Sequence, residues 1–237
     1  MTDADDTPVR LRLDHISTRM ASLHDAGRFV MRYGPAVQRY ILAILRDANA
    51  ADDVWQELVA ALLKRGGPGT WPGKGRFRDY LRTAARNAAM THLRKANRHP
   101  AGELPDDVSG RAERGLDDDW RRSLLEKVWR QLDATERGGG GFAHTALRIY
   151  TEHDDLDSPA QAKLAGEKLG RAVTAEAFRQ QVSRGKRRMA ELILTEVAET
   201  VADATAADVE AELVELGLMK FVRDYLPADW RTKYFSD

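Results

Sequence analysis

One cationic stretch of the sequence combines the side-chain types that bind nucleic acid. Between Trp71 and His99, eight lysine and arginine residues occur with a single acid, Asp79. Cations neutralise phosphates and release their counterions. Tyr80 offers an aromatic face for an unpaired base, and Asn87 offers an amide that can hydrogen-bond to a base edge. The stretch therefore predicts a surface for single-stranded nucleic acid, and a plain solvated cationic helix is the alternative left open.

A second group of polar residues is acidic and lies upstream. Asp52 and Asp53 lie near the start of a helical range, and Asp53, Gln56, Glu57 and Lys64 lie opposite its apolar side. Acids are favoured in the first turn of a helix by its dipole, so a simple solvated helix start is one interpretation. A protein-docking surface with Gln56 and Glu57 facing outward is another. A metal site is poorly supported, because no histidine accompanies these acids at ligand spacing.

A third stretch has the pattern of two helices joined by a short turn. Ser158 followed by proline is expected to cap a helix over 159–169, Gly170 to end it, and Thr174 to cap the next helix. Five lysine or arginine residues then occur between Thr174 and Ala190. Helix, glycine-containing turn and basic helix are typical of the helix-turn-helix. An ordinary hairpin of a helical bundle is the open alternative.

Helices are expected to position all three stretches. Ala, Leu, Arg and Glu dominate and β-branched runs are scarce, which favours an all-α fold. Asn49 is expected to cap the helix with the acidic group. Helical periodicity of apolar residues occurs over 35–46, 52–64, 77–95, from about 120 onward, 142–151, 159–169, from 174, and 205–217. The inward stripe of 77–95 is expected to be Phe77, Leu81, Ala84, Ala85, Ala88 and His92, with Arg78, Arg82 and Arg86 on another side.

The helices are expected to form two small domains, the second containing the helix-turn-helix. Periodicity stops over 99–119, where prolines and glycines occur among acids, as in a flexible acidic linker. The acidic helix near the C-terminus either packs on the first domain or masks a basic DNA-binding face with its acids. The expected ranges are an N-terminal segment 1–28, a first domain 29–98, the linker 99–119, a second domain 120–196 and a C-terminal extension 197–237.

Composition excludes several classes of protein. The 237 residues have zero net charge and no cysteine, so disulfides and cysteine-ligated metals are absent. No apolar run reaches the ~20 residues of a membrane span, and the acidic start is unlike a signal peptide, so a cytoplasmic location is expected. A phosphate-binding Gly-Lys-Ser/Thr loop is missing, and no histidine pairs with a plausible nucleophile. No enzyme activity, catalytic residue, metal or cofactor is therefore expected.

The first domain resembles a known family. An Asp-Asp-x-x-Gln-Glu helix, a glycine-rich loop, Phe-Arg-x-Tyr-Leu-Arg-Thr-x-Ala-Arg-Asn and then Leu-Arg-Lys follow in the order of the second domain of bacterial sigma factors of the extracytoplasmic-function, sigma-70-like type. The resemblance implies that the acidic helix docks on RNA polymerase through Asp52, Asp53, Gln56 and Glu57. It also implies that the melted minus-ten promoter strand is read by Tyr80, Arg86, Asn87, Thr91, Arg94 and Lys95. The family motif usually has an acid where Thr91 stands.

The helix-turn-helix is similar to the fourth sigma domain, which enters the major groove at the minus-thirty-five element. The resemblance implies DNA contacts from Ala177, Arg179, Gln181, Arg184, Lys186, Arg187 and Arg188. The implied function is a sigma factor that directs RNA polymerase core to promoter DNA, with an anti-sigma factor left open as a further partner. Two alternatives stay open: a sigma-like adaptor that binds polymerase or a regulator without reading a promoter, and a plain helix-turn-helix repressor.

Overall fold

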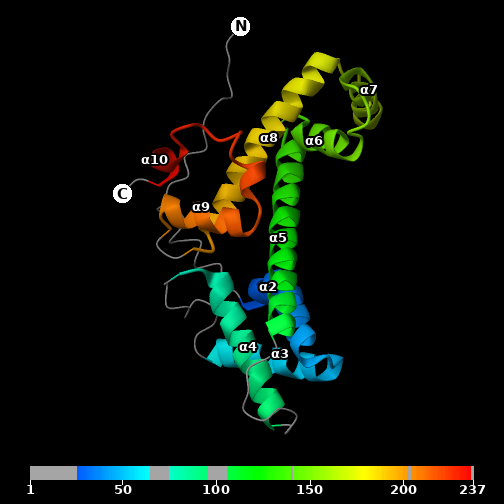
Figure 1. Cartoon of the computed structure of the whole chain (residues 1–237). Helices are drawn as coiled ribbons and strands as arrows, with labels where there is room; N and C mark the ends of the chain where they lie inside the picture. The colour runs from blue at the N-terminus through cyan, green and yellow to red at the C-terminus, as the bar shows by residue number, and fades with distance from the viewer. Residues whose placement is uncertain (1–25, 65–74, 96–105, 140, 202–203, 236–237) are drawn as a thin grey trace. The chain divides into compact units, whose positions relative to one another are not determined.

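The computed structural model describes residues 26–64, 75–95, 106–139, 141–201 and 204–235 (Figure 1). Its elements are α2 (Ala26–Leu45), α3 (Ala48–Lys64), α4 (Phe77–Lys95), α5 (Asp106–Arg137), α6 (Ala143–Glu152), α7 (Ser158–Leu169), α8 (Ala175–Ala198), α9 (Ala206–Glu215), the 3-10 helix η3 (Met219–Phe221) and α10 (Trp230–Tyr234). Within the described ranges the regular structure is helical, apart from an isolated antiparallel bridge between Arg76 and Val201. The prediction of an all-α protein is confirmed.

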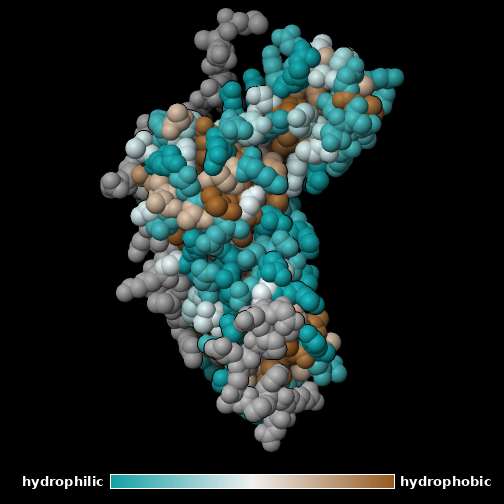
Figure 2. Space-filling model, in the orientation of Figure 1, coloured by the Kyte–Doolittle hydropathy of each residue, from teal (hydrophilic) through white to brown (hydrophobic). Residues whose placement is uncertain are grey.

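The chain divides into two compact units. Unit one comprises residues 1–123, 197–212 and 229–237, and unit two comprises 124–196 and 213–228. The expected C-terminal extension is thus shared between the units instead of standing apart. On the face drawn in Figure 2, hydrophobic residues form separate areas among mostly hydrophilic ones, as amphipathic helices produce.

The first two helices of unit one are held together by a close approach. A Cβ atom at Gly34 of α2 would lie 3.1 Å from a ring carbon of Trp55 in α3, so glycine lets the indole pack on the backbone. Helix α2 begins at Ala26, nine residues before the expected start, and keeps Pro35 in its interior. Helix α3 is capped by Asp47 and not by Asn49, since a carboxylate oxygen of Asp47 accepts from the Ala50 amide at 3.1 Å.

Helix α4 buries a stripe that repeats every four residues. Phe77, Leu81 and Ala85 are buried as predicted. The stripe then continues through Ala89 and Leu93, with Met90 beside it, and not through the remaining predicted positions. Ala84, Ala88 and His92 are only half-buried. The predicted inner face is therefore rotated by part of a turn from the observed one. Small alanines lie on both sides of the buried stripe, so the sequence pattern shows no contrast in hydrophobicity there.

The prediction of a flexible linker is wrong for residues 106–119, which form the first part of α5. Ala112, Leu116 and Trp120 repeat every four residues and are buried in unit one. The ring of Trp120 stacks on Tyr33 with 4.4 Å between ring centroids. Two glycines and many acids weaken the helical signal here, but burial of one large aromatic residue and its neighbours stabilises the helix through tertiary packing.

Part of the C-terminal segment completes unit one. The amide of Phe77, at the start of α4, donates to the carbonyl of Thr200 at 2.9 Å. Thr200 and Val201 are 3% and 4% exposed, so this connection is closed to water. The side chains of Val209, Leu213 and Leu216, through which the acidic helix was expected to pack, are all buried; Val209 belongs to unit one, and Leu213 and Leu216 belong to unit two.

Unit two contains the predicted pair of helices α7 and α8. Asp157, and not the expected Ser158, caps α7 by accepting from the Ala160 amide at 2.9 Å, and Gly170 ends the helix in the left-handed conformation with φ 65°. Thr174 caps α8 as predicted, since its hydroxyl accepts from the Ala177 amide at 3.1 Å. The turn between the helices therefore has the capping chemistry that the sequence indicates.

Gly185 allows a close approach between α6 and α8. A Cβ atom there would lie 3.0 Å from the backbone carbonyl oxygen of Ala143 and 3.4 Å from the Cβ of Leu147. Gln181, one turn earlier on α8, accepts the Phe142 amide at 3.3 Å. The start of α6 thus packs closely on α8 because Gly185 has no side chain, and the Gln181 side chain holds it there with a hydrogen bond.

Candidate nucleic-acid interface

The outer side of α4 carries a polar strip at helical spacing. Asn87, Thr91, Arg94 and Lys95 are all exposed, with Thr91 four residues after Asn87 and with Arg94 and Lys95 three and four residues after Thr91, on one side of the helix. The Thr91 hydroxyl donates to the Asn87 carbonyl at 2.8 Å, so it is oriented along the helix. Four of the six predicted minus-ten residues are therefore together and open to a ligand. We call these four residues the α4 strip.

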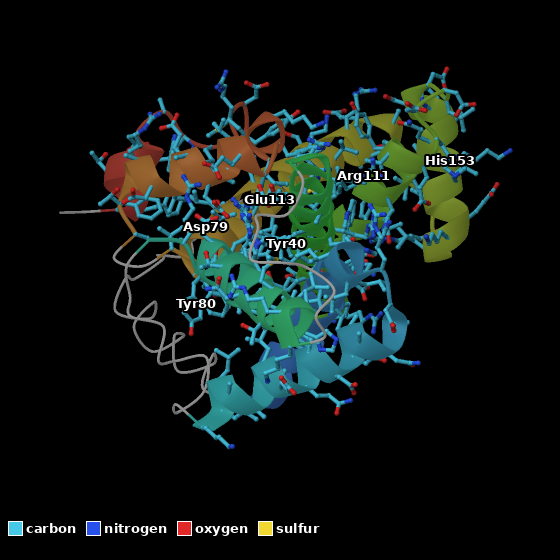
Figure 3. The ribbon with its side chains drawn as sticks, turned by 60° about the horizontal axis from the view of Figure 1, so that its bottom comes forward. Tyr40, Asp79, Tyr80, Arg111, Glu113 and His153 are labelled. Atoms are coloured by element: carbon cyan, nitrogen blue, oxygen red, sulfur yellow. The ribbon has the colours of Figure 1, made fainter. Side chains whose placement is uncertain are left out.

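Tyr80 is placed differently, at the first turn of α4. It is half-buried and stacks on Phe77 with 6.1 Å between ring centroids and 23° between ring planes. Figure 3 shows Tyr80 beside Asp79 on α4, with Tyr40 on α2. One face of the Tyr80 ring is thus used inside the protein, and the half-exposed remainder is what a base could contact.

The cationic side of α4 is matched by carboxylates, contrary to the prediction that its charge is almost unopposed. Arg82 contacts Asp117 of α5 at 2.9 Å and Asp79 at 3.3 Å. Arg86, the sixth predicted minus-ten residue, lies 4.0 Å from Glu113 of α5. The side chain of Arg86 is 39% exposed, so it is partnered but still accessible. The sequence could not show this pairing, because both acids come from the segment expected to be a linker.

Arg78 is fully inside this network. Its guanidinium is 1% exposed and donates two parallel hydrogen bonds to Glu212, of 3.0 and 2.9 Å, as well as one to Asp117. Burial alone would lower the pKa of Arg78, but the hydrogen bonds and charge of Glu212 together with Asp117 and Asp79 raise it above its ordinary value. Arg78 therefore carries a permanent charge that is neutralised inside the protein and is closed to phosphate.

The pKa of Tyr40 on α2 is shifted by burial and by charged residues of α4 and α5. Removal from water raises the pKa of the Tyr40 hydroxyl, and the nearby Glu113 carboxylate adds to the effect, while Arg86 and Arg82 oppose it. Tyr40 is 2% exposed. It is a core residue beneath the cationic side of α4 and offers no ring to a ligand.

The predicted docking residues form a continuous exposed strip on α3. Asp52, Asp53, Gln56 and Glu57 are all exposed, whereas Val54, Trp55 and Leu58 between and after them are buried. The amide of Gln38 donates weakly to Asp52 at 3.4 Å. The strip is therefore an acidic and polar surface on a helix whose opposite side is fixed in the core, and we call it the α3 strip.

Helix α8 presents an exposed polar face in unit two. Arg179, Arg184 and Arg187, all predicted, are exposed on it. Gln180 and Ser183 share this face and were missed; the available signal was their spacing, since Gln180 lies four residues before Arg184 and Ser183 lies four residues from both Arg179 and Arg187.

The other predicted residues of α8 have partners inside unit two. Gln181 holds the start of α6, and Ala177 is half-buried. Arg188 pairs with Glu191 at 3.1 Å. The ammonium of Lys186 lies 4.0 Å from the Tyr150 ring centroid. Burial would lower the pKa of Lys186, but interactions with the hydroxyl groups of Tyr150 and Tyr225 raise it.

Neither a membrane span nor a metal site is found in the described part of the chain. Within those residues no helix is long and apolar enough to cross a bilayer. No group of three or more potential ligands lies together among them.

The segment that carries the α3 strip and the α4 strip matches a known protein family. Residues 29–99 match the family model Sigma-70 region 2, which includes α3 and α4. No curated protein and no solved structure matches the chain significantly. Sigma factors are non-catalytic members of the transcription initiation machinery that act with RNA polymerase core and promoter DNA. Residues 29–99 of the chain, which carry the α3 strip and the α4 strip, are therefore similar to sigma-70 region 2.

Proposed function

We propose that this protein is a sigma factor of the extracytoplasmic-function type that reads the minus-ten element as a single strand through the α4 strip. The supporting observation is that Asn87, Thr91, Arg94 and Lys95 are exposed together on one helix face within the region 2 segment. Their amide, hydroxyl and cationic groups suit base edges and phosphates. Tyr80 and Arg86 border the strip and are partly accessible.

The α3 strip is the proposed contact with RNA polymerase core. Its four side chains are exposed and net acidic, and they stand on a helix whose opposite side is buried, so they fit a basic or amide-rich helical surface on the partner. Replacing Glu57 by lysine should weaken binding to core polymerase, whereas the matched change at Glu126, which is also exposed on a helix, should not. Strand binding measured without core separates this step from DNA reading.

A second DNA contact is proposed for α8. Its exposed face combines Arg179, Arg184 and Arg187 with Gln180 and Ser183, a mixture suited to phosphates and base edges in a major groove. Its proposed target is the minus-thirty-five element. Gln181, Lys186 and Arg188 already have partners within unit two, so they are proposed to support the helix.

The test is transcription with purified core polymerase from a library of random promoters. Asn87→Ala and Arg94→Ala should each lower promoter-directed initiation by roughly tenfold, as expected for one well-placed contact. Asn49→Ala and Arg130→Ala are controls, because both residues are exposed and lie outside the proposed contacts. If both strip variants initiate like the wild type, an adaptor role replaces the sigma function. Tight duplex binding without core would instead favour a helix-turn-helix repressor.

A further inference from the structure

The start of α4 is fixed by residues more than a hundred positions later in the chain. The Phe77 amide donates to the Thr200 carbonyl at 2.9 Å, and Arg76 and Val201 form an antiparallel bridge. These contacts hold the backbone just before and at the first residue of α4. The reading helix therefore begins on a support supplied by residues 200–201.

Glu212 of α9 adds a buried charge at the same place. Its side chain is fully buried, and its two carboxylate oxygens accept from the Nε and Nη2 of Arg78 in a bidentate arrangement. One of these oxygens also lies 3.2 Å from the Nε of Arg76. A single carboxylate thus joins two arginines that flank Phe77. Such a pair costs desolvation, and removing one member leaves a buried charge without its partner, so it specifies one arrangement of the helix start.

The contact of Glu212 with Arg76 and Arg78 also bears on the two roles that the sequence left open for the acidic helix, which are packing on the first domain and masking a DNA-binding face. A mask would need its acids to cover the groups that contact DNA. Asn87, Thr91, Arg94 and Lys95 are exposed, and the Glu212 carboxylate contacts Arg76 and Arg78 at the start of the helix. The acids of α9 at this contact are therefore placed to fix α4 and not to cover the α4 strip.

We propose that Glu212 is a positioning residue for the DNA-reading helix, and that Thr200, Val201 and Glu212 together set the position and phase of α4. Glu212 acts through Arg76 and Arg78 and touches no ligand itself. Because α4 is one continuous helix from Phe77 to Lys95, a change in its first turn is passed to the exposed strip beyond it. The statement about DNA reading rests on the proposed minus-ten function, whereas the statement about α4 does not.

The experiment compares Glu212→Gln with wild type in the full chain. Glutamine keeps the size of the side chain and removes its charge. Glu210→Gln is the matched control, since Glu210 lies on the same helix and pairs with Arg231 at the surface. Amide hydrogen exchange over α2, α3 and α4, binding to core polymerase, and binding of a single-stranded minus-ten oligonucleotide to the holoenzyme are measured at 25 °C.

The expected result is selective. In Glu212→Gln the first turn of α4 exchanges at least about tenfold faster, and α2 and α3 keep their protection. Core affinity stays at the wild-type level, while strand affinity falls by roughly tenfold, the equivalent of one lost base contact. Glu210→Gln behaves as wild type in each measurement.

Three other outcomes would overturn the proposal. Tighter strand binding by Glu212→Gln means that the residue masks DNA. Equal loss of core and strand binding, together with faster exchange throughout unit one, means that it only stabilises the fold. Unchanged exchange in α4 removes the positioning role whatever the binding data show. If the wild-type holoenzyme itself binds no strand, the minus-ten proposal fails, and the exchange comparison still decides the role of Glu212.

Discussion

Replacing Trp120 by alanine tests whether the first part of α5 is a packed helix of unit one or a solvated connection. Trp120 is 3% exposed and stacks on Tyr33 with 4.4 Å between centroids, and its ring lies 6.4 Å from that of Phe77. Truncating a buried tryptophan in this way costs about 3–5 kcal/mol. A residue in an exposed linker would change stability by less than about 0.5 kcal/mol.

Amide hydrogen exchange of α2 and α4 measures this loss within unit one, independently of unit two. A loss of 3–5 kcal/mol corresponds to exchange of the most protected amides that is faster by about two to four powers of ten. Trp120→Phe keeps a stacked ring and should lose less. Arg114→Ala, exposed on the same helix, is the control and should leave exchange unchanged. Wild-type protection in the alanine variant would refute the packing of α5 against α2.

Three further changes test other contacts. Gly185→Ala should destabilise unit two by up to about 2 kcal/mol, because overpacking against the Ala143 carbonyl outweighs the gain in helix propensity. Gly115→Ala, which has no neighbouring atom within 4 Å, should stabilise the protein by about 0.5–1 kcal/mol. Thermal unfolding compares the two variants. Thr174→Ala should cost about 1 kcal/mol through loss of the α8 cap, seen as faster amide exchange in its first turn. Burial lowers the pKa of His144 in the folded protein, so the unfolded chain binds this proton more tightly. The folded state is therefore most stable above about pH 6.5, and its stability falls as the pH drops below that value. Urea unfolding of His144→Gln should show a weaker loss between pH 7.5 and 5.5, and an unchanged pH dependence would contradict this.

Local patterns predicted much of the two exposed strips in unit one. The acidic strip of α3 follows from apolar residues at helical spacing, which place Trp55 and Leu58 inside and the acids outside. Asn87, Thr91 and Arg94 were predictable because residues four and seven apart share a face. These features depend on the helix period alone, so they need no knowledge of the partners that each helix packs against.

Contacts between distant residues could not be read in this way. Arg78 and Glu212 each resemble ordinary surface charges in the sequence, and only their meeting across 134 positions makes them a buried pair. Gln181 and Lys186 lie on a basic helix but face α6 and Tyr150, since the phase of α8 is set by packing within unit two. The first part of α5 was missed for the same reason, because its helix depends on burial of Trp120.

The distance along the chain between Arg78 and Glu212 also affects how the protein is made. Ribosomes add about 5–20 residues per second, so the 134 positions between the two residues take roughly 7–27 s to synthesise. The region 2 segment is thus synthesised before Glu212, whose carboxylate fixes the start of α4. Thr200 arrives only shortly before Glu212, so both supports of α4 come late. The region 2 segment therefore reaches its final arrangement only after Glu212 has been synthesised, 134 positions after Arg78.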